Sequence, residues 1–121
     1  MGTSQDITAI KDYWRSRFLA IAAQLVPVVA QAGWCADGFD PKTGYPLYSQ
    51  PGSLRLDDAA VVKACLGYDD RHWANCRVVL HPDWADAVYP SVVLTTTPPT
   101  QLWQYADQYL RIPASVFPLE A

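Results

Sequence analysis

The sequence predicts an α+β fold in a single domain of residues 1–121, with a long N-terminal helix across a small, mostly antiparallel sheet and two shorter helices. Apolar residues follow a helical period through the first quarter of the chain. Two Val-Val-Leu triplets, at 78–80 and 92–94, have the β-branched character of buried strands. Strands and helices do not alternate regularly, which argues against a doubly wound parallel sheet.

The N-terminal segment is predicted to be a helix that ends at Gly33. Pro27 removes one backbone donor and is expected to kink this helix near Ala23. Segment 17–33 also has features of an export signal, but the regular stripe and two preceding aspartates favour a structural helix. The apolar positions fall within a stripe about 80° wide at 100° per residue and are Ile7, Ile10, Trp14, Phe18, Ile21, Leu25, Val28 and Ala32.

Turn-forming residues dominate 34–53. Short strands around Phe39 and over 45–49 are expected to form a hairpin across 41–44. The glycines lack the spacing of a phosphate-binding loop or a dinucleotide fingerprint, so they are interpreted as turn residues.

A short helix is predicted to follow, with Asp57 as its N-cap and Gly67 as its stop. A third helix is predicted over 99–110, because proline is tolerated in a first helical turn. The tail over 112–119 contains two prolines, which limits it to an edge strand.

Composition narrows the classes of function. The net charge is -3 and no stretch gathers the basic residues, which argues against nucleic-acid binding. No apolar run reaches the roughly 20 residues that a membrane-spanning helix needs. Charged residues make up 17% of the chain, below the average of about 25%, which favours self-association or a partner. The three cysteines are expected to be free, buried thiols in a cytoplasmic protein.

Both histidines and two cysteines gather within one stretch of 19 residues, numbered 65–83. Their Cys-His-Cys-His order lacks the tight ligand pairs of structural zinc sites, so neither a metal nor a cofactor is predicted. Asp69 and Asp70 are interpreted as a turn or as the N-cap of a short helix. An alternative function is a small enzyme acting on a small polar substrate, with Cys76 as nucleophile and His72 or His81 as base.

Five tryptophans and seven tyrosines are many for this length. Trp14 and Trp103 are predicted to lie in the core. Loop tryptophans favour interfaces and ligand pockets, although they can also close the ends of a small sandwich. The candidate ligand-binding residues are Trp34, Trp73, Trp84, His72 and His81.

The sequence therefore favours a small binding or interaction protein without catalysis, which forms a symmetric homodimer and has a small-molecule or protein partner. The second half of the long helix is apolar on all sides, so Leu19, Ala23, Val26 and Ala30 are expected to need cover from a second copy. Cover by the tail is the alternative. Besides the enzyme, a protein antagonist of the immunity or phage type stays open as a function.

Overall fold

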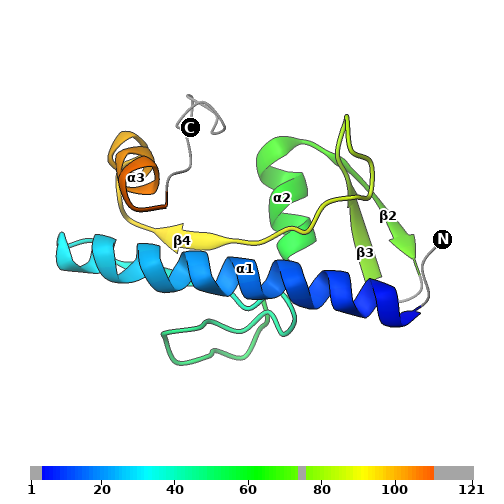
Figure 1. Cartoon of the computed structure of the whole chain (residues 1–121), viewed down its shortest axis with the longest axis horizontal. Coiled ribbons are helices and arrows are strands. Elements are labelled where there is room, and N and C mark those ends of the chain that lie inside the picture. Colours follow the sequence, from blue (N-terminus) through cyan, green and yellow to red (C-terminus); the bar gives the residue numbers. More distant parts are fainter. Residues whose placement is uncertain (1–3, 74–75, 111–121) are drawn as a thin grey trace.

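The computed structural model describes residues 4–73 and 76–110 and confirms the predicted α+β fold (Figure 1). The predicted tail, over 112–119, lies outside these residues. No helix in the described ranges is long and apolar enough to cross a membrane. In chain order the elements are α1 (Ser4–Gln31), β1 (Ala36–Gly38), α2 (Asp58–Leu66), β2 (Asp69–Trp73), β3 (Cys76–Leu80), β4 (Val93–Thr95), α3 (Pro99–Tyr105) and the π-helical turn η1 (Ala106–Leu110).

Helix α1 ends where the sequence predicts. Gly33 has a φ of 96°, and backbone N–H groups of Gly33 and Trp34 bond to carbonyls of Ala30 and Val29 at 3.0 Å each. These two bonds are those of a Schellman motif. The helix continues through Pro27 without ending there (Figure 1). Pro27 has no N–H group to donate to the Ala23 carbonyl. Both residues are exposed, so water can reach this carbonyl instead.

The main core forms where α1 packs against β1, α3 and η1. Gly38 allows this close approach, since a Cβ there would lie 3.3 Å from the Ala22 Cβ and 3.1 Å from a Leu47 methyl group. Ala106 of η1 also belongs to this core and is 2% exposed. The buried side chains that α1 contributes are Phe18, Ala22, Leu25, Val26 and Val29.

The strands form two separate antiparallel pairs. β1 pairs with β4, with Asp37 opposite Leu94, and β2 pairs with β3, with Asp70 opposite Val79. Each Val-Val-Leu triplet therefore contributes to a different sheet. The expected hairpin across 41–44 is reduced to a single bridge between Phe39 and Pro46.

Strand β2 corrects the interpretation of Asp69 and Asp70 as a turn or an N-cap. Its sequence is mostly polar, but all five of its residues pair in register with β3. Asp70 forms an ion pair with Lys63 of α2 at 2.7 Å. Pairing with the apolar strand β3 thus overrides the weak strand preference of the β2 sequence.

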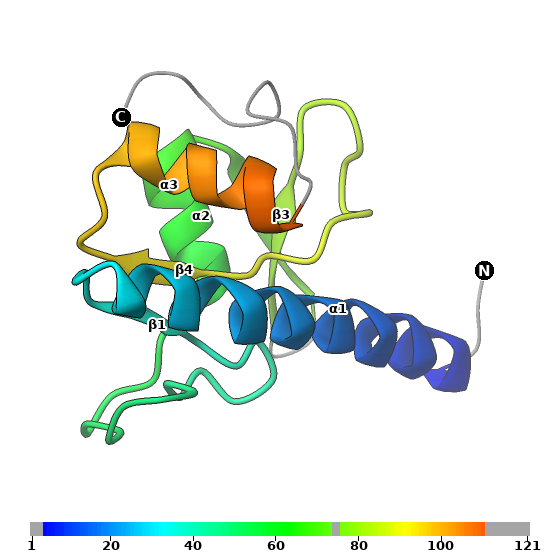
Figure 2. The ribbon, with the colours of Figure 1, turned by 60° about the vertical axis from the view of Figure 1, so that its left-hand side comes forward.

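The expected burial of Trp14, Cys35 and Cys65 is wrong. The N-terminal turns of α1 extend past the other elements (Figure 2), and Trp14 is 48% exposed. Cys35 and Cys65 are free but exposed, since Cys35 follows the end of α1 and Cys65 lies on the outer side of α2. Trp103, the other tryptophan predicted for the core, is half-buried.

The shorter helices follow their local signals. The Asp57 side chain accepts a hydrogen bond from the Ala60 N–H at 3.1 Å, and Gly67 closes α2 with a φ of 70°. The helix predicted over 99–110 is observed as α3 followed directly by η1.

Candidate functional site

His81 lies just after β3 in a cluster of three aromatic side chains. Its ring stacks on Trp84, with centroids 4.1 Å apart and 14° between the planes, and Tyr68 meets it edge-on at 5.1 Å. Two backbone hydrogen bonds between His81 and Ala85, of 2.8 and 2.9 Å, close the intervening loop. Ala85 takes a φ of 52°, which non-glycine residues rarely adopt. This tight loop holds Trp84 over His81 while leaving Trp84 64% exposed.

The loop also orients the His81 ring. Nδ1 accepts hydrogen bonds from the backbone N–H groups of Asp83 at 3.0 Å and Trp84 at 3.2 Å. In a neutral imidazole, an accepting Nδ1 leaves the proton on Nε2. His81 can therefore offer one N–H donor to a ligand.

An apolar pocket of about 260 Å³ adjoins this cluster. Its walls come from α2, from residues in or next to the β2–β3 pair, and from the segment 88–90. Only His81 and two tyrosines bring polar groups, which is the usual character of small-molecule sites. Its volume is slightly below the roughly 300–1,000 Å³ of sites for drug-sized ligands. The lining residues are Val62, Leu66, Tyr68, Val79, His81, Val88, Tyr89 and Pro90.

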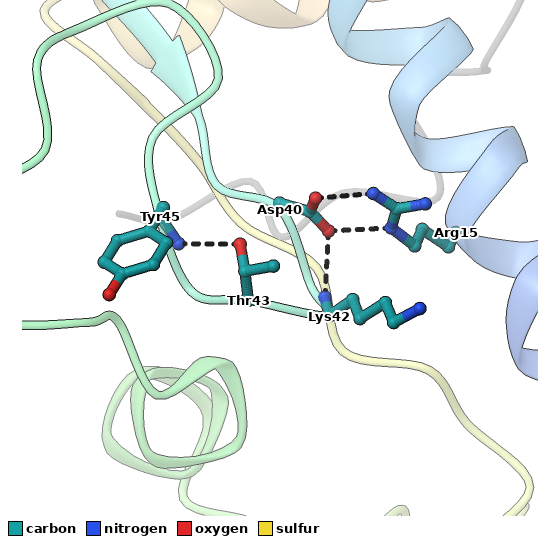
Figure 3. A network of polar contacts seen from close by, with 5 residues as sticks. All are labelled: Arg15, Asp40, Lys42, Thr43 and Tyr45. Atoms are coloured by element: carbon teal, nitrogen blue, oxygen red, sulfur yellow. Dashed lines mark hydrogen bonds and ion pairs between the residues drawn. The ribbon is translucent and has the colours of Figure 1, made fainter.

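A two-pronged ion pair fixes the loop after β1 against α1 (Figure 3). Arg15 donates from Nε to Asp40 Oδ1 at 2.8 Å and from Nη2 to Oδ2 at 2.6 Å. The backbone N–H of Lys42 donates to the same carboxylate at 2.9 Å. The hydrogen bonds from Arg15 hold the pKa of Asp40 below its ordinary value, and the pairing raises the pKa of Arg15.

Asp58 of α2 and Tyr89 lie within reach of the charges of this ion pair. Oδ1 of Asp58 is enclosed and has no hydrogen-bond partner within the described part of the chain. Burial, followed by the charges of Asp57 and Asp40, raises the pKa of Asp58 to about 6. Burial also raises the pKa of Tyr89, which senses the charges of Asp40 and Asp58. Because Tyr89 lines the pocket as well, it links the pocket electrostatically to the ion pair.

Of the five predicted ligand-binding residues, the structure brings His81 and Trp84 together. His72 is exposed on β2 opposite Arg77, four positions from the Tyr68 that contacts His81. Four strand positions separate the two histidines by about 13 Å. Trp34 is half-buried just after α1 and lines neither of two surface pockets. Trp73 ends β2, and its side chain lies outside the described part of the structure.

The residues of the alternative enzyme site are spread along the same two strands. Cys76 stands opposite Trp73 in the register and five positions before His81, or about 16 Å along the strand. His72 is the closer histidine, since its pairing partner Arg77 follows Cys76 directly. No group of three His, Cys, Asp or Glu side chains within 4–73 and 76–110 could hold a metal ion.

Sequence reasoning missed Tyr89, Asp58 and the Arg15–Asp40 pair. The two paired residues are 25 positions apart, and no spacing rule connects a helix residue with a loop residue at that distance. Asp58 follows an N-cap aspartate and reads as an ordinary acid of a first helical turn. The chain matches no model of a known protein family and no curated protein.

Proposed function

We propose that the protein is a small, non-catalytic binding protein whose ligand occupies the pocket lined by Tyr68, His81 and Tyr89, hereafter the His81 pocket. The observation that carries this proposal is the fixed His81 ring beside an apolar cavity. An aromatic ring held by contacts with Trp84 and Tyr68 loses little freedom when it contacts a ligand, which favours affinity.

The shape and chemistry of the His81 pocket favour a compact ligand with one ring and one hydrogen-bond acceptor. Its volume of about 260 Å³ suits a single ring with small substituents. The aliphatic and aromatic walls favour an apolar body. An acceptor on the ligand, such as a carbonyl oxygen, would meet the N–H of His81 Nε2. Trp84 stays exposed beside the pocket and can cover one edge of a larger ligand.

A fragment screen tests this proposal. The probes are single-ring lactams and amides, and the readout is the shift of backbone resonances from Tyr68, Val79 and His81 in NMR spectra of the full chain. Val62→Phe fills the His81 pocket and should weaken any such binding at least about tenfold. Ala64→Phe adds the same side chain at an exposed position of α2 and should leave binding unchanged.

Two results would count against the His81 pocket. One is a library in which no compound shifts these resonances in a saturable way. The other is a compound that binds equally well to wild-type protein and to Val62→Phe. The retained folding of each variant is read from the dispersion of the same spectra.

We further propose that the protein works in the cytoplasm. Cys35 and Cys65 are exposed and unpaired. Exposed free thiols persist in a reducing compartment and become oxidised outside it. Labelling of both thiols by a maleimide in freshly lysed cells, without prior reduction, tests this. Thiols that react only after reduction would contradict it.

We also propose a homodimer through the second half of α1, although its contact residues differ from those expected from the sequence. Val26 is 6% exposed, so this chain already covers it. Together with Gln24 and Gln31, small residues instead form the exposed side of the same helical turns: Ala20, Ala23, Pro27 and Ala30. Their size would let two α1 helices approach closely, and two-fold dimers are the commonest assembly.

Ala23→Glu tests this contact. The substitution lies at an exposed position, so the monomer should fold, while two buried carboxylates should prevent dimer formation. Light scattering at micromolar concentration is expected to give a dimeric mass for wild type and a monomeric mass for the variant. A monomeric wild type contradicts the proposal without affecting the His81 pocket.

A further inference from the structure

A second pocket lies against α1 and shares Tyr89 with the His81 pocket. Its volume is about 220 Å³, and four of its six lining residues have large apolar or aromatic side chains. We call it the Trp14 pocket. Its lining residues are Trp14, Arg17, Phe18, Ile21, Tyr89 and Ser91.

We propose that the Trp14 pocket binds a small aromatic carboxylate, with its ring against the apolar walls and its carboxylate on the Arg17 guanidinium. This goes beyond the ligand of the His81 pocket, because it concerns a separate cavity and a ligand of different charge. The two pockets share only the Tyr89 side chain.

The aromatic part of the ligand follows from the walls. Trp14 is 48% exposed and Phe18 is 9% exposed, so the pocket is lined by one exposed and one buried aromatic side chain. An exposed tryptophan face gains free energy when a flat apolar group covers it. A cavity of about 220 Å³ accepts one ring or two fused rings.

The carboxylate follows from the polar groups. Arg15, which follows Trp14 in the sequence, is already bound to Asp40. Arg17 lines the pocket, and no ion pair joins it to a carboxylate in the described ranges. A guanidinium carries only donors and matches a carboxylate with two parallel hydrogen bonds. Ser91 supplies a hydroxyl that can donate a third.

Nearby carboxylates repel an anionic ligand, so its binding in the Trp14 pocket depends on the positive charge of Arg17. Asp12, Asp40 and Asp58 all act on the charge state of Tyr89, which lines the pocket. Of these three acids, Asp40 is paired with Arg15, whereas no ion pair in the described ranges neutralises Asp12 or Asp58. Without Arg17 the pocket would therefore offer a carboxylate no compensating positive charge, so its substitution should remove the preference for the acid.

The experiment compares acids with their amides on the full chain. The probes are phenylacetate and 2-naphthoate, each paired with its neutral amide, and the readout is the indole N–H resonance of Trp14 together with the backbone resonance of Ser91. The acids should bind at least about tenfold more tightly than the amides, the difference expected for charge-assisted hydrogen bonds.

Matched variants separate the charge of Arg17 from the general charge of the helix. Arg17→Gln should remove the preference for the acid, whereas Lys11→Gln, which removes another exposed charge of α1, should preserve it. Val62→Phe should leave acid binding unchanged, so this site is tested independently of the His81 pocket. Equal binding of acid and amide to wild type, unchanged acid binding in Arg17→Gln, or no saturable shift at millimolar ligand would overturn the proposal.

Discussion

The substitution Asp58→Asn should stabilise the protein at neutral and alkaline pH. Asp58 is a half-buried carboxyl whose Oδ1 atom has no hydrogen-bond partner in the described part of the chain. Its pKa is raised to about 6, chiefly by burial. The folded protein therefore favours the protonated form, and this contribution to stability is complete below about pH 4. It is lost as the pH rises through 6.

The magnitude follows from the pKa difference. A change from 3.8 to about 6 is about two pKa units, or about 3 kcal/mol at 1.36 kcal/mol per unit. Since Asp58 is only half-buried, solvent screening reduces this to about 1–2 kcal/mol. Asn also loses a favourable negative charge at the N-terminus of α2, worth about 0.3–1 kcal/mol. The expected net gain at pH 8 is about 1 kcal/mol.

Urea unfolding at pH 4.5, 6 and 8 measures this effect. The free energy of unfolding of wild type should rise as the pH falls from 8 to 4.5, while that of Asp58→Asn should stay nearly level. Asp57→Asn removes a charge from an exposed neighbour and should keep most of the wild-type slope. Below about pH 4 stability should fall in all variants, because Asp40 and Asp70 have lowered pKa values. Parallel slopes in wild type and Asp58→Asn would refute the reasoning.

Four further substitutions have expected effects on the free energy of unfolding, each measured by urea titration at pH 7. Gly44→Ala should destabilise by about 2 kcal/mol, because φ is 76° and a Cβ would lie 2.6 Å from the Leu56 carbonyl oxygen; a loss under about 0.5 kcal/mol would contradict this. Ala85→Gly should stabilise by about 0.5 kcal/mol by relieving a φ of 52°, and any loss would be evidence against strain there. Asp40→Asn should cost about 2 kcal/mol, whereas Asp86→Asn at an ion pair more than half exposed should cost under about 0.5 kcal/mol; equal costs would contradict the ranking.

Local signals in the sequence were sufficient for the helices. The end of α1 at Gly33 and the limits of α2 between Asp57 and Gly67 depend on residues within one turn of the helix end. Such helix ends need no distant partner, so composition and spacing predict them. The sequence also marks His81 and Trp84 as candidate ligand residues, but their stacking is seen only in the structure.

Tertiary structure alone decided the features whose partners are distant in sequence. The polar segment Asp69–Trp73 is a strand because β3 supplies its backbone partners. Trp14 belongs to the apolar stripe of α1 but is 48% exposed, whereas Phe18, one turn later in the same stripe, is 9% exposed. Tyr89 lies in a connection without a motif, yet the packing of α1 and α2 around it forms both pockets. A local pattern indicates which side chains favour burial or pairing. The positions of the neighbouring elements determine which of these side chains become buried or paired.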